Sequence, residues 1–263
     1  MLSQIYNYNF IKEGIMKYII TLFLFLLNIN FAYSQVNIES LRSEKSGHNL
    51  ELGASFLSQS GNNNVVSGDL KSVFHYRAKS NYLFFKAEIA KGKQDKKYFI
   101  DNTFSHLRWT YMFTDIVGLE LFTQFQQDKF KKLSLRQLNG FGLRSEVYKG
   151  KKDILSIGTS AMTDFEDIVE KSSLVIRSSS YISFAHGFDK EKKSQLLLVG
   201  YYQPTFVNPE DYRINAEFNL RSSLIEKLNI SLELTVVYLY DTNPPVDILT
   251  NDLIIKTGLL FKL

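Results

Sequence analysis

The 263-residue sequence has no cysteine, only four prolines and only four histidines. The absence of cysteine excludes a disulfide framework and any thiolate that could act as a metal ligand or nucleophile. No two histidines have the spacing of a metal site. A mean hydropathy of −0.13 argues against a bundle of lipid-buried helices, whereas a transmembrane barrel needs only alternate residues to be apolar. The net charge is only +4, so nothing indicates nucleic acid or another polyanion as a partner.

A short apolar run near the N-terminus predicts a secretory signal. Met16 and Lys17 precede the run, which ends in small residues at Ser34. This order predicts cleavage after Ser34, with Met16 as the true start. The alternative, a spanning helix, needs about 20 apolar residues, and residues 18–27 are too few. The sequence therefore predicts a signal peptide at 1–34 and a single domain at 35–263.

Beyond residue 35, apolar and polar residues alternate with a period of two, which is typical of β-strands. In one segment, Tyr212, Ile214 and Phe218 share a face opposite Arg213 and Glu217. Most of the predicted strands exceed the usual ~5–6 residues of globular strands and reach the ~9–11 that cross a bilayer. About twelve strands are expected, near 48–58, 65–78, 81–92, 97–112, 116–128, 133–148, 153–165, 171–187, 194–206, 211–224, 228–241 and 252–263.

The connections between these strands favour a transmembrane antiparallel up-and-down β-barrel. An even number of strands places both termini on one side, expected to be the periplasm. Every second connection, such as AKSN at 78–81, is short and polar, and the others are modestly longer. None is long enough to predict a constriction loop inside the lumen. A soluble sandwich or lipocalin-like barrel shares the alternation but has little reason to end on an apolar strand.

The final residues, KTGLLFKL, have the form polar-x-Gly-x-x-apolar-x-apolar. This pattern resembles the C-terminal targeting strand of bacterial outer-membrane barrels. The resemblance implies recognition by the barrel-assembly machinery. Phe261 and Leu263 are expected to face lipid, and Lys256 and Lys262 the lumen. The predicted assembly signal comprises Lys256, Gly258, Phe261 and Leu263.

The polar face of the predicted strands should line the lumen with charges of both signs. One interpretation is a polar channel for small solutes, and the other is a network of ion pairs that closes a narrow barrel, because confined charges must be paired. Twelve strands lie between filled eight-stranded barrels and wide porins, which favours a narrow lumen. The candidates are Lys71, His75, Arg77, Lys86, Glu88, His106, Arg108, Glu120, Arg136, Arg144, Glu146, Arg177, Arg213, Glu217, Arg221 and Glu233.

Aromatic residues gather toward the predicted strand ends, where rings form girdles at the headgroup level in outer-membrane barrels. The alternative is ordinary strand propensity, because Tyr and Phe are enriched in any strand. The pairs concerned are Phe74 and Tyr76, Trp109 and Tyr111, Tyr201 and Tyr202, and Tyr238 and Tyr240.

No constellation in the sequence predicts catalysis. A lipid hydrolase needs a serine and a histidine within hydrogen-bond reach, but Ser105 and Ser183 fall on the opposite strand face from His106 and His186. The acidic segments DFED and NPED are interpreted as solvated loops rather than cation sites. The glycines of NGFGLR (139–144) do not precede a helix, so they indicate a bend or bulge rather than a phosphate loop.

The middle of the chain carries a more specific pattern. The segment RWTYMFTDIVGLELFTQFQQDKFKKLSLRQLNGFGLR combines an aromatic strand, a Thr-Asp turn, Asp-x-Phe and Gly-x-Gly-x-Arg, and SQSGNNNVVSG precedes it. Both segments resemble the bacterial domain-of-unknown-function family 481, which includes salt-induced outer-membrane proteins. The likeness spans roughly residues 48–263. It implies an outer-membrane barrel without an established catalytic role, although Leu263 stands where many barrels end in Phe.

These observations predict an integral outer-membrane β-barrel that is a narrow pore or an envelope-maintenance (stress) barrel. We expect no enzyme activity, no catalytic or metal site and no cofactor. The expected partners are outer-membrane lipid, lipopolysaccharide and the barrel-assembly machinery. The alternative function is an outer-membrane hydrolase of the phospholipase type.

Overall fold

The computed structural model describes residues 46–59, 65–94, 97–168, 171–189 and 194–262. The predicted signal peptide and Leu263 lie outside this part of the chain. Within it, no helix has the length and apolar character that a membrane-spanning helix requires.

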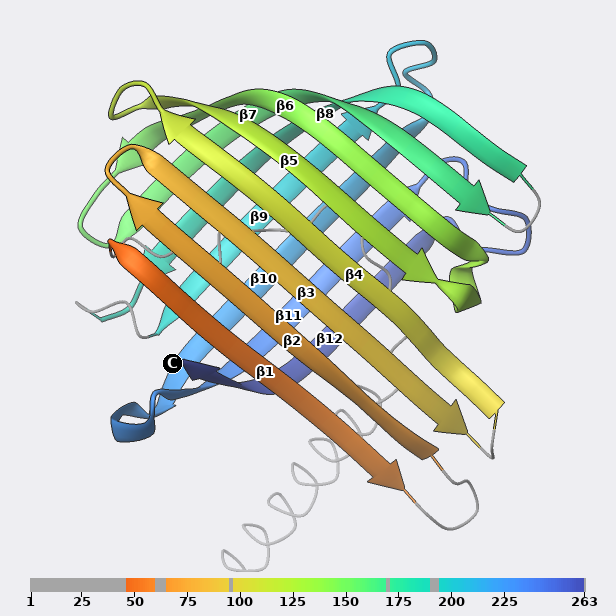
Figure 1. Cartoon of the computed structure of the whole chain (residues 1–263), viewed down its shortest axis with the longest axis horizontal. Coiled ribbons are helices and arrows are strands. Elements are labelled where there is room, and N and C mark those ends of the chain that lie inside the picture. The colour runs from red at the N-terminus through yellow and green to blue at the C-terminus, as the bar shows by residue number, and fades with distance from the viewer. Residues whose placement is uncertain (1–45, 60–64, 95–96, 169–170, 190–193, 263) are drawn as a thin grey trace, which may run out of the picture. The chain divides into compact units, whose positions relative to one another are not determined.

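The described chain forms a closed barrel of twelve antiparallel strands, each paired with its sequence neighbours, and β1 pairs with β12 (Figure 1). The predicted all-β antiparallel barrel is thereby confirmed. The strands are β1 (Gly47–Gln59), β2 (Val65–Ala78), β3 (Asn81–Gln94), β4 (Lys97–Met112), β5 (Val117–Asp128), β6 (Leu133–Lys149), β7 (Asp153–Ile168), β8 (Lys171–Gly187), β9 (Gln195–Pro204), β10 (Tyr212–Ile225), β11 (Ile230–Asp241) and β12 (Asn251–Lys262). Two single-turn 3-10 helices, η2 (Lys129–Lys131) and η3 (Glu226–Leu228), lie in connections.

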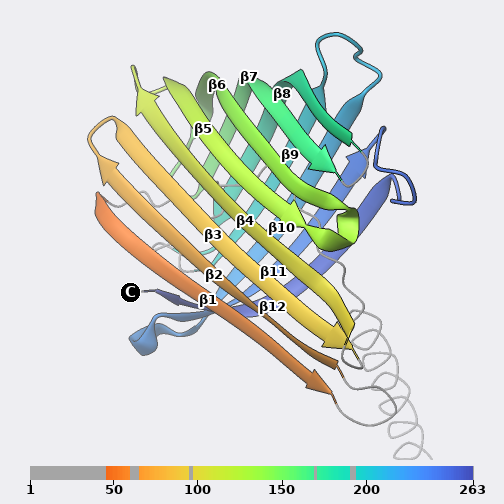
Figure 2. The same cartoon turned by 45° about the vertical axis from the view of Figure 1, so that its right-hand side comes forward.

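The strands run at a steep tilt (Figure 2). Because consecutive strands are antiparallel neighbours, the odd-numbered connections lie at one end of the barrel and the even-numbered ones at the other. We call these ends the η2 mouth and the opposite mouth. At the opposite mouth, β2 and β3 are joined by only Lys79 and Ser80. Lys79 has a φ of 50°, a left-handed conformation that permits this tight turn.

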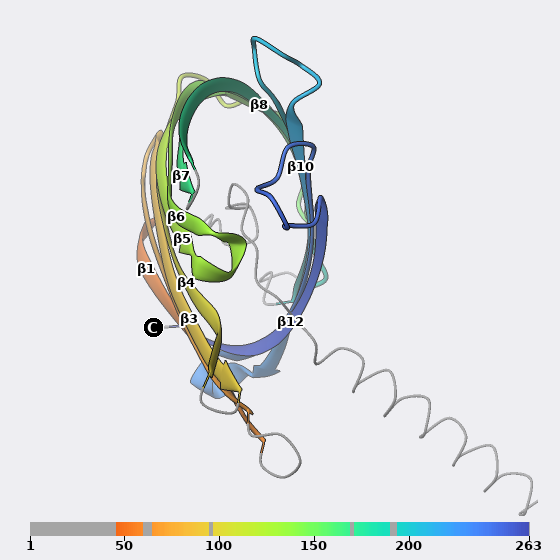
Figure 3. The same ribbon diagram turned by 90° about the vertical axis from the view of Figure 1, so that its right-hand side faces the viewer.

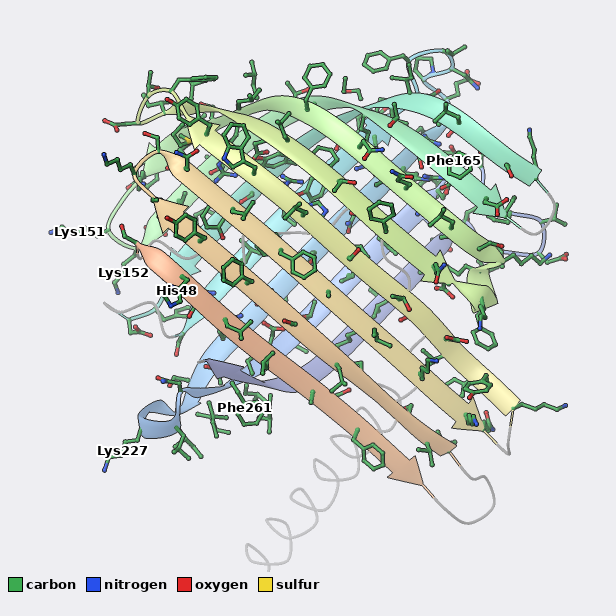
Figure 4. The ribbon with its side chains drawn as sticks, in the orientation of Figure 1. His48, Lys151, Lys152, Phe165, Lys227 and Phe261 are labelled. Atoms are coloured by element: carbon green, nitrogen blue, oxygen red, sulfur yellow. The ribbon has the colours of Figure 1, made fainter. Side chains whose placement is uncertain are left out.

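The two faces of the sheet have opposite character. Along β5, Glu120, Phe122 and Gln124 are buried, whereas the intervening Leu121 and Phe125 are each 42% exposed. The same alternation continues round the barrel, and apolar side chains project from the outer face (Figure 4). Charged groups therefore lie inside and apolar groups outside, the reverse of a water-soluble barrel. Outward apolar residues of this kind include Leu52, Leu70, Phe85, Ile89, Leu107, Leu121, Phe125, Phe141, Leu143, Ile176, Ile182, Leu198, Leu232, Leu253, Leu259 and Phe261.

Aromatic rings cluster on the outer face near both mouths. Near the opposite mouth, Trp109 stacks on Tyr111 with ring centroids 6.0 Å apart, and Tyr111 meets Phe113 edge to face at 5.3 Å. Near the η2 mouth, rings of three strands meet, with centroids 5.5 and 5.8 Å apart, at Tyr202, Tyr212 and Tyr240. The girdle interpretation fails for Tyr201, which is 2% exposed and packs inside against Tyr181, because successive strand residues point to opposite faces.

Among the described residues, the closing pair of strands has fewer paired residues than any other pair of neighbouring strands in the barrel. β1 and β12 are matched over four residue pairs, from Glu51–Lys262 to Ala54–Leu259, whereas β1 and β2 are matched over thirteen. The predicted pairing of the last strand with the first is thus present, but over a short stretch.

Candidate functional site

The interior wall carries all sixteen of the polar side chains predicted to face the lumen. Ten of them are buried: His75, Lys86, Glu88, His106, Arg108, Glu120, Arg144, Arg177, Arg213 and Glu233. The other six are half-buried at interior positions of the same alternation: Lys71, Arg77, Arg136, Glu146, Glu217 and Arg221. Sequence reasoning missed several interior groups that bind them, namely Glu51, Gln124, Asp164, Glu166, Tyr181 and Asp241. The signal was present for Gln124, Tyr181 and Asp241, since each shares a strand face with a predicted neighbour. The interpretation of DFED as a solvated loop is wrong for Asp164 and Glu166, because both lie on β7 and bind Arg213 inside the barrel.

A first group of interior residues, the central cluster, surrounds Glu120 on β5. Its carboxylate accepts hydrogen bonds from Arg108 at 3.1 Å, Thr110 at 3.3 Å and Tyr181 at 2.9 Å. The Tyr181 hydroxyl also accepts a hydrogen bond from Arg144 at 3.0 Å. Because β8 lies three strand positions from β5, Tyr181 joins two separated parts of the wall. Bonds to a buried carboxylate are charge-assisted and therefore strong.

Two glycines make room for rings in this region. Gly140 is the cross-strand partner of Phe122, and Gly158 is the partner of Tyr181. A Cβ at either glycine would approach the partner ring to 2.2 Å. The glycine pair does not form a bulge, because the register of β6 shifts only near its two ends. Because Gly140 has no side chain, the Phe122 ring can lie directly over the backbone of the neighbouring strand.

A second group, the mouth cluster, lies inside the η2 mouth. Arg213 on β10 contacts three carboxylates, those of Asp164 at 2.6 Å, Glu166 at 2.7 Å and Asp241 at 2.7 Å. Arg177 binds Asp164 at 2.9 Å, and Arg136 forms an ion pair with Glu166. Each guanidinium offers several donors in a fixed fork, which suits this multiple pairing of buried carboxylates.

A third group, the closing-strand cluster, joins the strands on either side of the β1–β12 pair. Lys71 on β2 binds Glu233 on β11 at 2.9 Å. Arg221 on β10 contacts both Glu51 and Glu233 at 3.2 Å. Beside this cluster, Lys256 on β12 binds Glu88 on β3 at 2.7 Å. These ion pairs hold together the part of the wall where the strand register is shortest.

At the η2 mouth, the β5–β6 connection turns inward, and so does the β11–β12 connection from the other wall (Figure 3). Lys131 forms an ion pair with Asp252, and Lys132 donates to the carbonyl of Val246 at 2.8 Å and to Asp247 at 3.2 Å. We call this contact the mouth bridge. The connections that form the mouth bridge are short, but a single helical turn is enough to reach across.

The turn that carries the mouth bridge is fixed by its own first residues. The Asp128 side chain accepts hydrogen bonds from the backbone of Phe130 and Lys131, as an N-cap does. Lys129 binds Asp101 on β4, and this hydrogen bond and charge raise the pKa of the Lys129 ammonium. η2 is thus anchored to its own wall by Asp128 and Lys129, independently of the contacts that Lys131 and Lys132 make across the mouth.

The histidines are engaged in separate contacts rather than in one site. His75 bonds to Tyr82 at 2.7 Å and His106 to Gln124 at 3.2 Å, both inside the barrel. His186 lies on the outer face and pairs with Asp153 at 2.6 Å. Ser183 is buried on the inner face, so it cannot be the nucleophile of His186.

Among the described residues, no group of three or more His, Asp or Glu side chains is placed to hold a metal ion. Of the predicted assembly signal, Lys256 faces the lumen and Phe261 is 38% exposed on the outer face. A Cβ at Gly258 would meet no atom within 4 Å, so packing does not require a glycine there. The side chain of Lys262 and all of Leu263 lie outside the described part of the chain.

A family model described as "Protein of unknown function, DUF481" matches residues 50–263. A search of curated proteins found no match. Among solved structures, the barrel is similar to a NanC porin, with 11% identity and a TM-score of 0.48, covering 82% of this chain and 100% of the other. It is also similar to a "Bacterial polysaccharide outer membrane secretin", with 8% identity, a TM-score of 0.43 and coverage of 83% and 98%. A KdgM porin matches with 9% identity, a TM-score of 0.41 and coverage of 82% and 96%.

Proposed function

The chain belongs to the DUF481 family of proteins of unknown function, and we propose that it is an integral outer-membrane β-barrel that forms a narrow polar pore without catalytic chemistry. The observation that carries this proposal is the reversed distribution of its side chains. Charged groups such as Arg108 and Glu120 are buried inside, and apolar groups such as Leu121 and Phe141 are exposed outside. An outer face of this kind is stable only against lipid.

Polar contacts between interior side chains fill part of the lumen and narrow the pore. Three contacts, Tyr181–Glu120, Arg213–Asp164 and Lys71–Glu233, join strands that are three positions apart. Side chains that reach over three strand positions leave less open space than in porins of 16–18 strands, which enclose an aqueous channel. The lumen is therefore suited to water and small ions, with charges of both signs along its wall. The orientation that we propose places the η2 mouth outside and the opposite mouth in the periplasm.

Planar-bilayer recording of the purified protein tests the pore directly. We expect a small single-channel current in KCl, well below that of a 16-stranded porin in the same bilayer. If protein whose folding is verified by gel migration gives no channel current in any recording, the pore proposal is wrong and an envelope-maintenance barrel is the remaining function.

A lipid hydrolase is the second candidate, and the His186–Asp153 pair on the outer face is the observation that favours it. A base held by a carboxylate is two-thirds of a hydrolytic triad. Residues at 184 and 188, which share this face, are both phenylalanine, so they supply no hydroxyl. We expect no fatty-acid release from phospholipid micelles. Fatty-acid release that is lost in the His186→Gln variant but kept in the His48→Gln variant would show that the protein is a lipid hydrolase and would contradict the proposed function.

A further inference from the structure

The mouth bridge spans the full width of the barrel. Asp252 is on β12, which lies five strand positions from β5 in one direction and six from β6 in the other. In a ring of twelve strands this is the opposite wall. Lys131 and Lys132 therefore reach from one wall to the other, whereas the ion pairs deeper in the lumen join strands three positions apart.

Each half of the mouth bridge is shaped by its own wall. On one side, Asp128 caps η2, and Lys132 has a left-handed φ of 56° that turns the chain back into β6. On the other side, Asp241 accepts a hydrogen bond from the backbone of Asn243 at 2.9 Å and is itself held by Arg213. Both halves are thus positioned independently of the contact between them.

The contact itself lies in a watery environment. The side chains of Lys131 and Asp252 are 21% and 26% exposed, and those of Lys132 and Asp247 are 29% and 82% exposed. Ion pairs with this exposure contribute little to stability and are screened by salt. Two well-fixed halves joined by weak contacts can separate without unfolding either wall.

The two mouths differ greatly in the space that they enclose. The cavity under the mouth bridge, lined by Lys131, Asp252, Arg136 and Arg213, has a volume of about 80 Å³. Since a water molecule occupies about 30 Å³ in the liquid, this cavity holds only a few waters. The cavity at the opposite mouth, lined by Arg77, Tyr82 and Glu146 among others, has a volume of about 490 Å³. Of these two cavities, the one under the mouth bridge is therefore much the smaller.

We propose that the mouth bridge is the solute-selecting constriction of the lumen. It rests on the proposed pore function. With the bridge intact, water and small inorganic ions pass and larger neutral solutes are held back. When the Lys131–Asp252 and Lys132–Asp247 ion pairs separate, η2 and the β11–β12 connection part, and solutes of larger diameter enter.

A charge swap tests the constriction. Lys131→Glu and Asp252→Lys each place like charges across the mouth, and the double variant K131E/D252K restores an opposite pair. We expect a several-fold larger KCl current and a larger polyethylene-glycol exclusion size for each single variant, and values near the unmodified protein for the double variant. Lys91→Glu is the matched control, because it breaks an exposed ion pair between β3 and β4 near the same mouth and leaves η2 and its contacts unchanged. Single variants that conduct like the control, or a double variant that stays open, overturn the proposal.

A chemical tether gives a second, independent test. The chain has no cysteine, so K132C/D247C offers two unique thiols. A disulfide needs Cα atoms within about 7 Å, so a short bis-maleimide that spans a lysine–carboxylate contact is the suitable linker. Tethering should prevent the increase in current that K131E causes. If tethered and untethered protein carry equal, non-zero currents, the mouth bridge is not the constriction, and the pore proposal itself still stands. The absence of current from all forms, with the tether formed, overturns the pore itself.

Discussion

The Tyr181 hydroxyl on β8 donates a hydrogen bond to the Glu120 carboxylate on β5 at 2.9 Å, although the two residues are 61 positions apart in the sequence. The same hydroxyl accepts from Arg144, so one phenol connects a guanidinium and a carboxylate. A barrel that is filled in this way resists flattening, because its walls are joined through the lumen as well as round the sheet.

Replacement of Tyr181 by Phe removes both hydrogen bonds and keeps the ring. We expect the free energy of unfolding to fall by about 1–3 kcal/mol, the range for losing a partner of a buried charged group. Urea unfolding in phospholipid vesicles measures this change. Tyr202→Phe is the control, because Tyr202 lies on the outer face and is 47% exposed. Equal effects of the two substitutions would show that the lumen contact has no special role.

Gly158 should tolerate no larger residue, because Tyr181 lies on it. Gly158→Ala places a Cβ 2.2 Å from the Tyr181 ring, so the ring must move and the bond to Glu120 must stretch or break. We expect the losses from G158A and Y181F to be strongly non-additive in the double variant, as for neighbours that share one interaction. Gly200→Ala is the control, since no atom lies within 4 Å of its added Cβ. Simple additivity within experimental error would contradict the shared contact.

Removal of Arg213 should destabilise the barrel more than the other substitutions. Arg213→Met leaves Asp241 without this partner, while Asp164 and Glu166 keep only Arg177 and Arg136. Breaking a buried ion pair by removing one partner costs about 3–5 kcal/mol. Arg213→Lys keeps the positive charge but lacks the several fixed donors of the guanidinium group, so we expect a smaller loss of unfolding free energy than for Arg213→Met. Vesicle unfolding experiments at neutral pH rank the three proteins. Equal stability of R213M and the unmodified protein would rule out a structural role for the mouth cluster.

A charge placed on the outer face should be costly in proportion to its depth in the membrane. Leu121→Arg lies near the middle of β5, where we expect a loss of about 2–4 kcal/mol. Val117→Arg lies at the end of the same strand, where we expect about 0–1 kcal/mol. The comparison uses one strand and one substitution type, so the difference reports depth alone. A larger loss of stability for the variant at residue 117 than for the variant at residue 121 would contradict the claim that residue 121 lies deeper in the membrane.

The strands and their faces could be predicted from the sequence because the period-two pattern is local. The segment from Tyr212 to Leu220 shows both faces without any knowledge of its neighbours, and the structure places Arg213, Asn215 and Asn219 inside. The predicted strand limits agree with the observed ones within a few residues, from 48–58 against Gly47–Gln59 to 252–263 against Asn251–Lys262. Long alternating strands leave little freedom for any other assignment.

Contacts across the lumen could not be predicted because they depend on the closure and stagger of the whole sheet. Nothing local to Glu120 indicates Tyr181, which lies three strand positions away. The mouth bridge was missed for a related reason. The segment DKFKK contains the capping Asp128 and the bridging lysines, but the partner Asp252 is 121 residues away from Lys131.

The most direct test of the account is the gel migration of the protein from the outer-membrane fraction, boiled against unboiled. A closed lipid-embedded barrel resists detergent at room temperature, so the unboiled protein should migrate as a distinct, more compact band that boiling converts to the full-length position. Truncation before Asn251, which removes β12, should abolish this difference. Recovery in the soluble fraction, or identical migration of the boiled and unboiled protein, would contradict an outer-membrane barrel.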